Sequence, residues 1–168
     1  MGLDTSTPER REQLAAIIAP WIAGCADDGY DAVELDNLDS WTRSDGLTME
    51  GNLALAALLV DVAHEHGLWA AQKNALDAGE AGPGAGFDLV VSEECGQYDE
   101  CSGYAELYGD RHVDVEYVES TSAADFAAMC EAGDVPEPDF VFNVAGRGWD
   151  NPGLALIGWD DDLIDDDG

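Results

Sequence analysis

The chain has 168 residues, of which 37 are Asp or Glu and only 6 are Lys or Arg, so its formal net charge at pH 7 is −31. A charge this negative repels nucleic acids and anionic membrane surfaces, and we expect neither as a partner. Because 46% of the residues are hydrophobic, the chain is too apolar for a disordered acidic protein. Its length suits a single domain over residues 1–168 with a buried core.

A helix is predicted near the N-terminus. Thr7 and Pro8 indicate its cap and first position, and apolar residues then recur at helical spacing as far as Cys25. Pro20 lies inside this pattern, and we expect it to kink or interrupt the helix.

Strands and helices are predicted to alternate after this helix. The apolar run at residues 30–35 predicts a strand, and Thr48 indicates the cap of a second helix that ends near Glu65, before Gly67. The same patterns predict strands at residues 67–74, 87–94, 112–118 and 139–144, helices at 104–108 and 123–131, and a weak helix followed by a glycine-rich loop at 79–86. This alternation is typical of parallel βαβ units.

The sequence shows neither a membrane span nor a signal segment, and it ends in an acidic stretch. No stretch approaches the roughly 20 apolar residues of a membrane span. No basic, apolar signal segment follows Met1, which leaves a cytoplasmic location open. Residues 160–168 are rich in Asp, and we expect them to form a solvated acidic tail.

Polar residues gather at the C-terminal ends of four predicted strands. In chain order they are Glu34, Asp36, Asn37 and Asp39; Gln72, Lys73 and Asn74; Glu93 and Glu94; and Glu116 and Tyr117. In a parallel β/α barrel these ends lie on one face, where active sites are built. An acidic surface alone would place its carboxylates on helix surfaces and loops, so it explains only part of the pattern.

Lys73 is the only lysine in the chain, and it lies at one of these strand ends. A cation there can neutralise neighbouring carboxylates, orient a nucleophile or donate to sugar hydroxyls. A Schiff-base role is opposed by the surrounding carboxylates, which favour the charged ammonium.

Carboxylates that converge on one cleft suit the cleavage of glycosidic bonds, in which one acid protonates the leaving oxygen and a second acts as nucleophile or base. Side chains alternate along a strand, so Glu34 and Asp36 point the same way, with Asp36 nearest the end. Glu93 and Glu94 point in opposite directions, so only one of them can enter the cleft.

No cofactor or metal site is expected. The glycine-rich segment at 79–86 follows a helix, which is the wrong order for a dinucleotide-binding motif. His64 and His66 are two residues apart near a helix end and face different ways.

The chain has four cysteines, two of which, Cys95 and Cys101, are close enough in sequence to close a small loop around Tyr98. A disulfide there would stabilise the fold by about 2 kcal/mol. Free, packed thiols are the alternative.

Four segments resemble, in this order, the catalytic domain of glycoside hydrolase family 114, the endo-α-1,4-polygalactosaminidase-like TIM barrels: DDGYDAVELDNLDSWTRSDGLT, AHEHGLWAAQKN, FDLVVSEECGQYDEC and VEYV. The resemblance implies a (β/α)8 barrel that cleaves α-1,4-linked galactosamine-rich polysaccharide outside the cell, without a cofactor. It also implies that Asp36 and Glu93 are the catalytic pair. The residues expected to contact substrate are Glu34, Asn37, Asp39, Lys73, Asn74, Tyr98, Glu116 and Tyr117.

Residues 3–7, LDTST, resemble the end of the family's fourth strand. The resemblance therefore implies a partial barrel of about four to six parallel strands that lacks the N-terminal strands. Its open edges favour a complementary N-terminal half or a second copy of the chain as a partner. The alternative to an enzyme is a catalytically incomplete barrel that serves as a carbohydrate-binding or interaction module.

The charge generates a first prediction. A net charge of −31 fits a halophile-type protein, whose self-repulsion is screened by concentrated salt. Dialysis to below about 0.1 M salt should therefore loosen the fold and weaken the near-ultraviolet circular dichroism. An unchanged spectrum in low salt would contradict this interpretation.

Overall fold

This computed structural model describes residues 3–117, 120–133, 135, 141–144 and 154–157. The chain falls into two compact units, Met1–Val90 and Val91–Gly168. The single-domain organisation stays a prediction, and the expected acidic tail at residues 160–168 lies outside the described residues.

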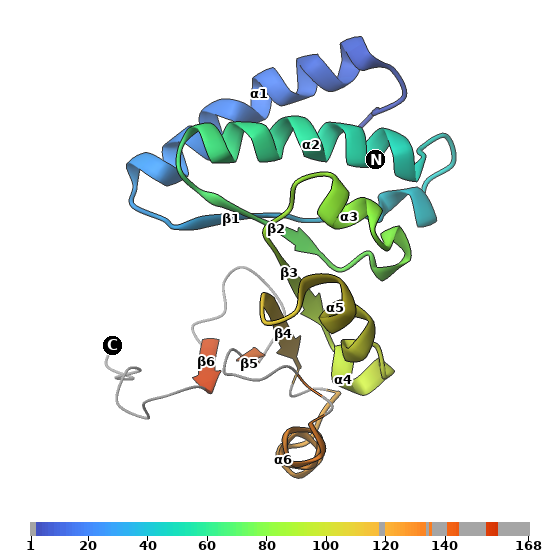
Figure 1. Ribbon diagram of the computed structural model, residues 1–168, viewed down its shortest axis with the longest axis vertical. Coiled ribbons are helices and arrows are strands. Elements are labelled where there is room, and N and C mark those ends of the chain that lie inside the picture. The colour runs from blue at the N-terminus through green and yellow to red at the C-terminus, as the bar shows by residue number, and fades with distance from the viewer. Residues whose placement is uncertain (1–2, 118–119, 134, 136–140, 145–153, 158–168) are drawn as a thin grey trace. The chain divides into compact units, whose positions relative to one another are not determined.

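The first unit alternates helices with two parallel strands. Its elements are α1 (Pro8–Asp27), β1 (Ala32–Leu35), η1 (Ser40–Thr42), α2 (Met49–Glu65), β2 (Trp69–Lys73), η2 (Leu76–Ala78) and α3 (Ala81–Gly84). β1 and β2 pair in parallel, with Ala32 opposite Trp69 and Leu35 opposite Gln72. Helices α1 and α2 pack side by side (Figure 1).

The helix caps are those that the sequence predicted. The Thr7 side chain accepts a hydrogen bond from the Arg10 amide, and the Thr48 side chain accepts one from the Gly51 amide. Helix α1 continues through Pro20, so the expected interruption is wrong, whereas the alternative, a kink, stays a prediction. A proline removes only one of the hydrogen bonds of a helix, and this helix has 20 residues.

The glycine-rich segment at 79–86 is not a simple loop, because α3 forms one helical turn within it. The Ala85 amide donates to the carbonyl oxygens of Ala81 and Gly82, at 3.1 and 2.9 Å. Gly86 then has φ +101°, and a Cβ there would lie 3.0 Å from Val60 Cγ1. The turn therefore needs glycine both for its backbone conformation and for its approach to α2.

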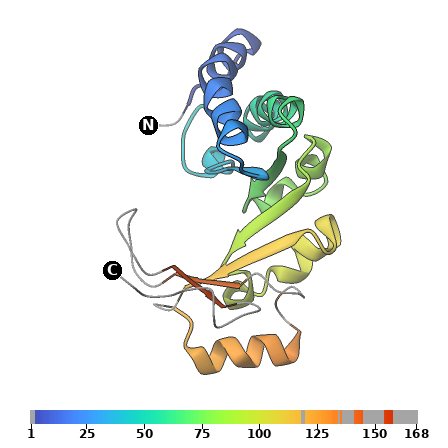
Figure 2. The same ribbon diagram turned by 90° about the vertical axis from the view of Figure 1, so that its left-hand side faces the viewer.

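The second unit has the same alternation and an antiparallel strand at its end. Its elements after β3 (Leu89–Glu93) are α4 (Cys95–Tyr98), α5 (Cys101–Tyr108), β4 (His112–Glu116), α6 (Ala123–Ala132), β5 (Val141–Val144) and β6 (Leu154–Ile157). β4 pairs in parallel with β5, whereas β5 and β6 are antiparallel. Helices α4 and α5 pack against β4 (Figure 2). The sequence did not predict α4.

The strand order is β1-β2-β3-β4-β5-β6 in one sheet. Four strands are paired in parallel, β1 with β2 and β4 with β5. The predicted α/β class and parallel pairing are therefore confirmed, and β6 is the strand that departs from the pattern. None of the described helices is long and apolar enough to cross a membrane.

The core of the first unit generates the second prediction. Leu68 is 3% exposed, so Leu68→Ala should lower the free energy of unfolding by about 2–5 kcal/mol, because it leaves a cavity. Ile17, at 58% exposed, is the matched control, and Ile17→Ala should change the free energy of unfolding by less than about 0.5 kcal/mol. Urea unfolding measures both, and equal effects would show that Leu68 is not a core residue.

Candidate active site

Asp36 follows the last residue of β1 and has a cation beside it. Its Oδ1 lies 3.5 Å from Lys73 Nζ, at the end of β2, and its Oδ2 accepts a hydrogen bond of 2.9 Å from Asn37 Nδ2. The Asp36 side chain is 60% exposed, whereas that of Lys73 is 10% exposed. The lysine therefore approaches from within the unit and leaves the carboxylate open to solvent.

Arg43 organises the loop that follows Asp36. Its guanidinium lies 2.6 Å from Asp39 Oδ2 and donates a hydrogen bond of 3.1 Å to Asn37 Oδ1. The hydrogen bond with Asp39 raises the pKa of Arg43 above its ordinary value. Asn37 and Asp39 thus have protein partners in addition to their expected role as substrate contacts.

A cavity of about 590 Å³ opens at this end of β1. Glu34, Asp36, Asn37 and Arg43 are among the residues that line it. Its volume is within the range of about 300–1,000 Å³ that is usual for small-ligand pockets. Leu35, which lies between Glu34 and Asp36, also lines the cavity, so the shared direction of the two carboxylates stays a prediction.

A buried amide holds the wall of this cavity. Asn52 on α2 donates hydrogen bonds of 2.8 Å to the Leu38 carbonyl oxygen and to Ser40 Oγ. The Thr5 hydroxyl donates to Asn52 Oδ1 at 2.8 Å. Because Asn52 is 6% exposed and all three contacts join it to other segments, it fixes the loop after β1.

The strand ends share an unusual backbone conformation. Left-handed φ values occur at Asn37, Asn74, Ala75 and Glu94, between 47° and 63°. One of these turns is held from within the unit, because Gln72 is fully buried and its Nε2 donates to the carbonyl oxygen of Asn74 at 2.6 Å. Left-handed values are uncommon outside glycine, and they cluster at functional sites.

Glu93 and Tyr117 meet at the ends of β3 and β4. The Tyr117 hydroxyl donates a hydrogen bond to the Glu93 carboxylate. Glu94 instead accepts a hydrogen bond from the Ser120 hydroxyl, and its amide donates to the Val115 carbonyl oxygen at 2.8 Å. The two neighbouring glutamates therefore have different partners, and their opposite directions stay a prediction.

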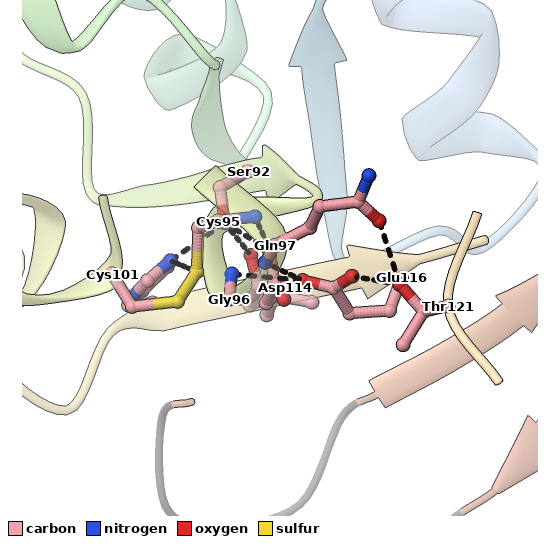
Figure 3. The surroundings of a disulfide bond; sticks show 10 residues. Ser92, Cys95, Gly96, Gln97, Cys101, Asp114, Glu116 and Thr121 are labelled. Atoms are coloured by element: carbon pink, nitrogen blue, oxygen red, sulfur yellow. Dashed lines mark hydrogen bonds between the residues drawn. A yellow bond between two sulfur atoms is a disulfide. The ribbon is translucent and has the colours of Figure 1, made fainter. Parts of the chain in front are cut away.

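Glu116 is buried, at 3% exposed, and the protein itself uses both of its oxygens. Oε1 accepts from the amides of Gly96 and Gln97, at 2.8 and 3.3 Å, and Oε2 accepts from the Thr121 hydroxyl at 3.0 Å (Figure 3). A Cβ at Gly96 would lie 3.0 Å from Oε1. Glu116 thus holds α4 in place from within the unit.

Beneath α4 lies a polar cluster that the sequence analysis missed. Cys95 and Cys101 form a disulfide, with their Cα atoms 4.8 Å apart. The Ser92 hydroxyl donates to Asp114 Oδ1 at 2.6 Å and lies 2.7 Å from His112 Nε2. The signal was present in the segment HVDVE, where polar residues alternate with valines and so share one face of β4.

Burial sets the charge of this cluster. It lowers the pKa of His112 to about 4. Burial also raises the pKa of Asp114 to about 7, although hydrogen bonds from Ser92 and the Cys95 amide oppose this shift, while the charge of Glu116 adds to it. At mildly acidic pH the folded protein therefore holds a neutral imidazole and a protonated carboxyl group.

The remaining expected residues are placed within their own units. Asn74 follows β2 in the left-handed turn, and Tyr98 ends α4 with 62% of its surface exposed. Asp36 belongs to the first unit and Glu93 to the second, so the pairing of these two carboxylates across one sugar stays a prediction.

Comparison with known proteins gives a family. The model of glycoside-hydrolase family GH114 matches residues 2–148. No curated protein matches the chain.

Two solved structures share the fold. The crystal structure of Ega3 from Aspergillus fumigatus in complex with galactosamine has a TM-score of 0.65 and 22% identity, over 83% of this chain and 58% of that one. The glycoside hydrolase domain of PelA from Pseudomonas aeruginosa has a TM-score of 0.56 and 20% identity, over 83% and 61%. The parallel strands thus correspond to part of a TIM-type barrel, and the chain spans about three fifths of each solved chain.

The buried cluster generates the third prediction. As the pH falls from 6.5 to about 4, His112 binds a proton in the unfolded chain but not in the folded one, so the free energy of unfolding falls. As the pH rises from 3.8 to about 7, unfolded Asp114 loses a proton that the folded form keeps, so stability also falls. In the disulfide-bonded protein the two slopes oppose each other between about pH 4 and 6.5.

Single substitutions should separate the contributions of His112 and Asp114 to the change of the unfolding free energy with pH. Relative to the unchanged chain, Asp114→Asn should make stability rise with pH across this window, and His112→Gln should make it fall, each by up to about 1.4 kcal/mol per pH unit. Urea unfolding at fixed ionic strength, with a chelator present, measures the slopes. The other acids are common to all three proteins, so parallel curves would contradict the assignment.

Proposed function

The chain belongs to glycoside hydrolase family GH114, and we propose that it is a glycosidase that cleaves α-1,4-linked galactosamine-rich polysaccharide at internal bonds. The observation that carries this proposal is the family match over residues 2–148, which includes both Asp36 and Glu93. Further support comes from the shared fold of Ega3, a protein crystallised with galactosamine.

The proposed chemistry uses two carboxylates. Asp36 and Glu93 flank the scissile bond, where one protonates the leaving oxygen and the other acts as nucleophile or activates water. Carboxyl groups about 5 Å apart would give retention of configuration, and groups about 6.5–9.5 Å apart would give inversion. No cofactor is required for either course.

The neighbouring residues have supporting roles in this proposal. Lys73, 3.5 Å from Asp36, offsets its charge and limits the positions that the carboxylate can adopt. Tyr117 orients Glu93 through its hydroxyl group. Both contacts fix the reacting groups before the substrate arrives, which lowers the entropic cost of reaching the transition state.

The substrate contacts follow from exposure and position. Glu34 and Asn37 line the cavity at the end of β1, Asp39 and Asn74 lie in the loops after β1 and β2, and Tyr98 presents an exposed ring. Glu116 acts indirectly, because it holds the backbone of α4. A deacetylated amino-sugar polymer is cationic, so a chain with a charge of −31 attracts it electrostatically.

A second candidate is a carbohydrate-binding or interaction module without catalysis. Such a module needs contacts with the polymer but not the pairing of Asp36 with Glu93, which belong to different units. Under either function the expected partner is a polysaccharide outside the cell.

The fourth prediction tests the catalytic pair. Asp36→Asn and Glu93→Gln should each abolish the release of oligosaccharide from galactosamine-rich polymer, because each removes a group that must transfer a proton or attack. Matched controls flank the same strands: Asp31→Asn, before the first residue of β1, and Glu94→Gln, after β3 and hydrogen-bonded to Ser120, should keep activity. Release is measured by chromatography of the soluble products.

Binding distinguishes the two candidate functions. If the unchanged chain binds the polymer in a sedimentation assay but releases nothing, it is a binding module. If Asp36→Asn and Glu93→Gln both retain activity, the catalytic assignment is wrong.

A further inference from the structure

The cluster under the disulfide contains three kinds of metal-ligating side chain. Cys95, His112 and Asp114 each offer one ligand atom, and these atoms all lie within 4.8 Å of one another. All three residues are buried, with exposed fractions of 0%, 6% and 0%. The three residues belong to the second unit, where Cys95 begins α4, and His112 and Asp114 lie on β4. Figure 3 shows Cys95 beside Asp114.

Two buried polar atoms of this cluster lack partners. Among the described residues, His112 Nδ1 and Asp114 Oδ2 make no hydrogen bond. A buried polar atom without a partner costs about 1–3 kcal/mol, so such atoms are rare in native proteins and call for an explanation. Asp114 is fully buried, and the negative charge of Glu116 raises its pKa further.

The distances suit a small ion of borderline softness. Cys95 Sγ lies 3.8 Å from His112 Nε2, so an ion bound there would satisfy the unpartnered Asp114 Oδ2 but not His112 Nδ1, on the other side of the ring. Two ligands of a tetrahedral Zn²⁺, at about 2.3 Å for sulfur and 2.0 Å for nitrogen, are roughly 3.5 Å apart. A thiolate, an imidazole and a carboxylate are together typical of zinc, whereas Ca²⁺ and Mg²⁺ require oxygen ligands.

The disulfide decides whether this set of ligands exists. In the oxidised chain, Cys95 Sγ is bonded to Cys101 and provides no thiolate. A dithiol can transfer two electrons and two protons to this bond, which gives two thiols while the dithiol becomes a disulfide. Ion binding then releases the proton of the Cys95 thiol to solvent.

We propose that reduction of the Cys95–Cys101 disulfide converts this cluster into a Zn²⁺ site, with Cys95, His112 and Asp114 as ligands. In oxidising surroundings the disulfide thus joins Cys95 to Cys101, and in reducing ones the ion joins Cys95 to His112 and Asp114 of β4. In both states Cys95 stays joined to the core of the second unit, so α4 keeps its position beside Glu93. The proposal is independent of the reaction that the chain catalyses.

The test uses Co²⁺ as a coloured probe for zinc in the full chain. Cys25→Ser and Cys130→Ser first remove the two free thiols. In that background, Cys101→Ser leaves Cys95 as a thiol without any reductant. We expect one Co²⁺ per chain, thiolate-to-cobalt charge-transfer absorption, and loss of that absorption when Zn²⁺ or a chelator is added.

Two matched variants distinguish this site from adventitious binding of Co²⁺ elsewhere on the chain. Cys95→Ser leaves Cys101 as the free thiol and should abolish the charge-transfer absorption. Asp114→Asn, added to Cys101→Ser, should weaken Co²⁺ binding by at least about tenfold. Equal absorption in the Cys95→Ser chain, or undiminished affinity with Asp114→Asn, would overturn the proposal.

The reduced parent chain provides a second measurement that does not depend on a substitution at Cys101. With a phosphine reductant present, Zn²⁺ should raise its thermal unfolding midpoint, and the same ion should leave the midpoint of the disulfide-bonded chain unchanged. A reduced chain that neither binds Co²⁺ nor gains stability from Zn²⁺ would overturn the proposal, whether or not the Cys101→Ser chain folds.

Discussion

The need of each strand-end carboxylate for a hydrogen-bond donor or a cation governs this structure. The chain has 37 acids and 6 basic side chains, so cationic partners are scarce. Two of the six serve the end of β1, where Lys73 lies beside Asp36 and Arg43 pairs with Asp39. Elsewhere neutral groups supply the donors, as the Tyr117 hydroxyl does for Glu93. A basic residue at a strand end is therefore a stronger indication of function in this chain than in an ordinary protein.

Two buried acids of β4 meet the cost of desolvation in different ways. Glu116 accepts hydrogen bonds from two backbone amides and a hydroxyl group, which compensate its charge. Asp114 has fewer donors, and burial raises its pKa to about 7, so it keeps its proton where other aspartates have lost theirs. Glu116 therefore holds α4 in place, whereas Asp114 changes its protonation state near neutral pH.

Local signals in the sequence were sufficient for the two long helices and the two strands of the first unit. Thr7 and Thr48 cap the helices that their positions predicted, because an N-cap hydrogen bond is formed within three residues. The cluster of Ser92, His112 and Asp114 was not predicted, because a polar face on β4 contradicts the rule that buried strand faces are apolar. It forms only when α4 covers that face, and the turn of α4 is itself held by Glu116, 20 residues away.

The site was predictable to the same extent. Lys73 beside Asp36, and Tyr117 beside Glu93, follow from polar residues at the ends of strands. The contribution of Glu116 to the backbone of α4 does not, because a sequence pattern places a side chain at a strand end without showing whether it faces solvent or a neighbouring amide.

The left-handed residues at the strand ends restrict how this sequence can change. Isoleucine, valine and threonine are strongly disfavoured at positive φ, whatever space surrounds them. β-Branched residues should therefore be poorly tolerated at Asn37, Asn74, Ala75 and Glu94, even where the side chains touch nothing essential. In a library of random variants these residue types would be depleted at the four positions, for a reason that neither burial nor chemistry reveals.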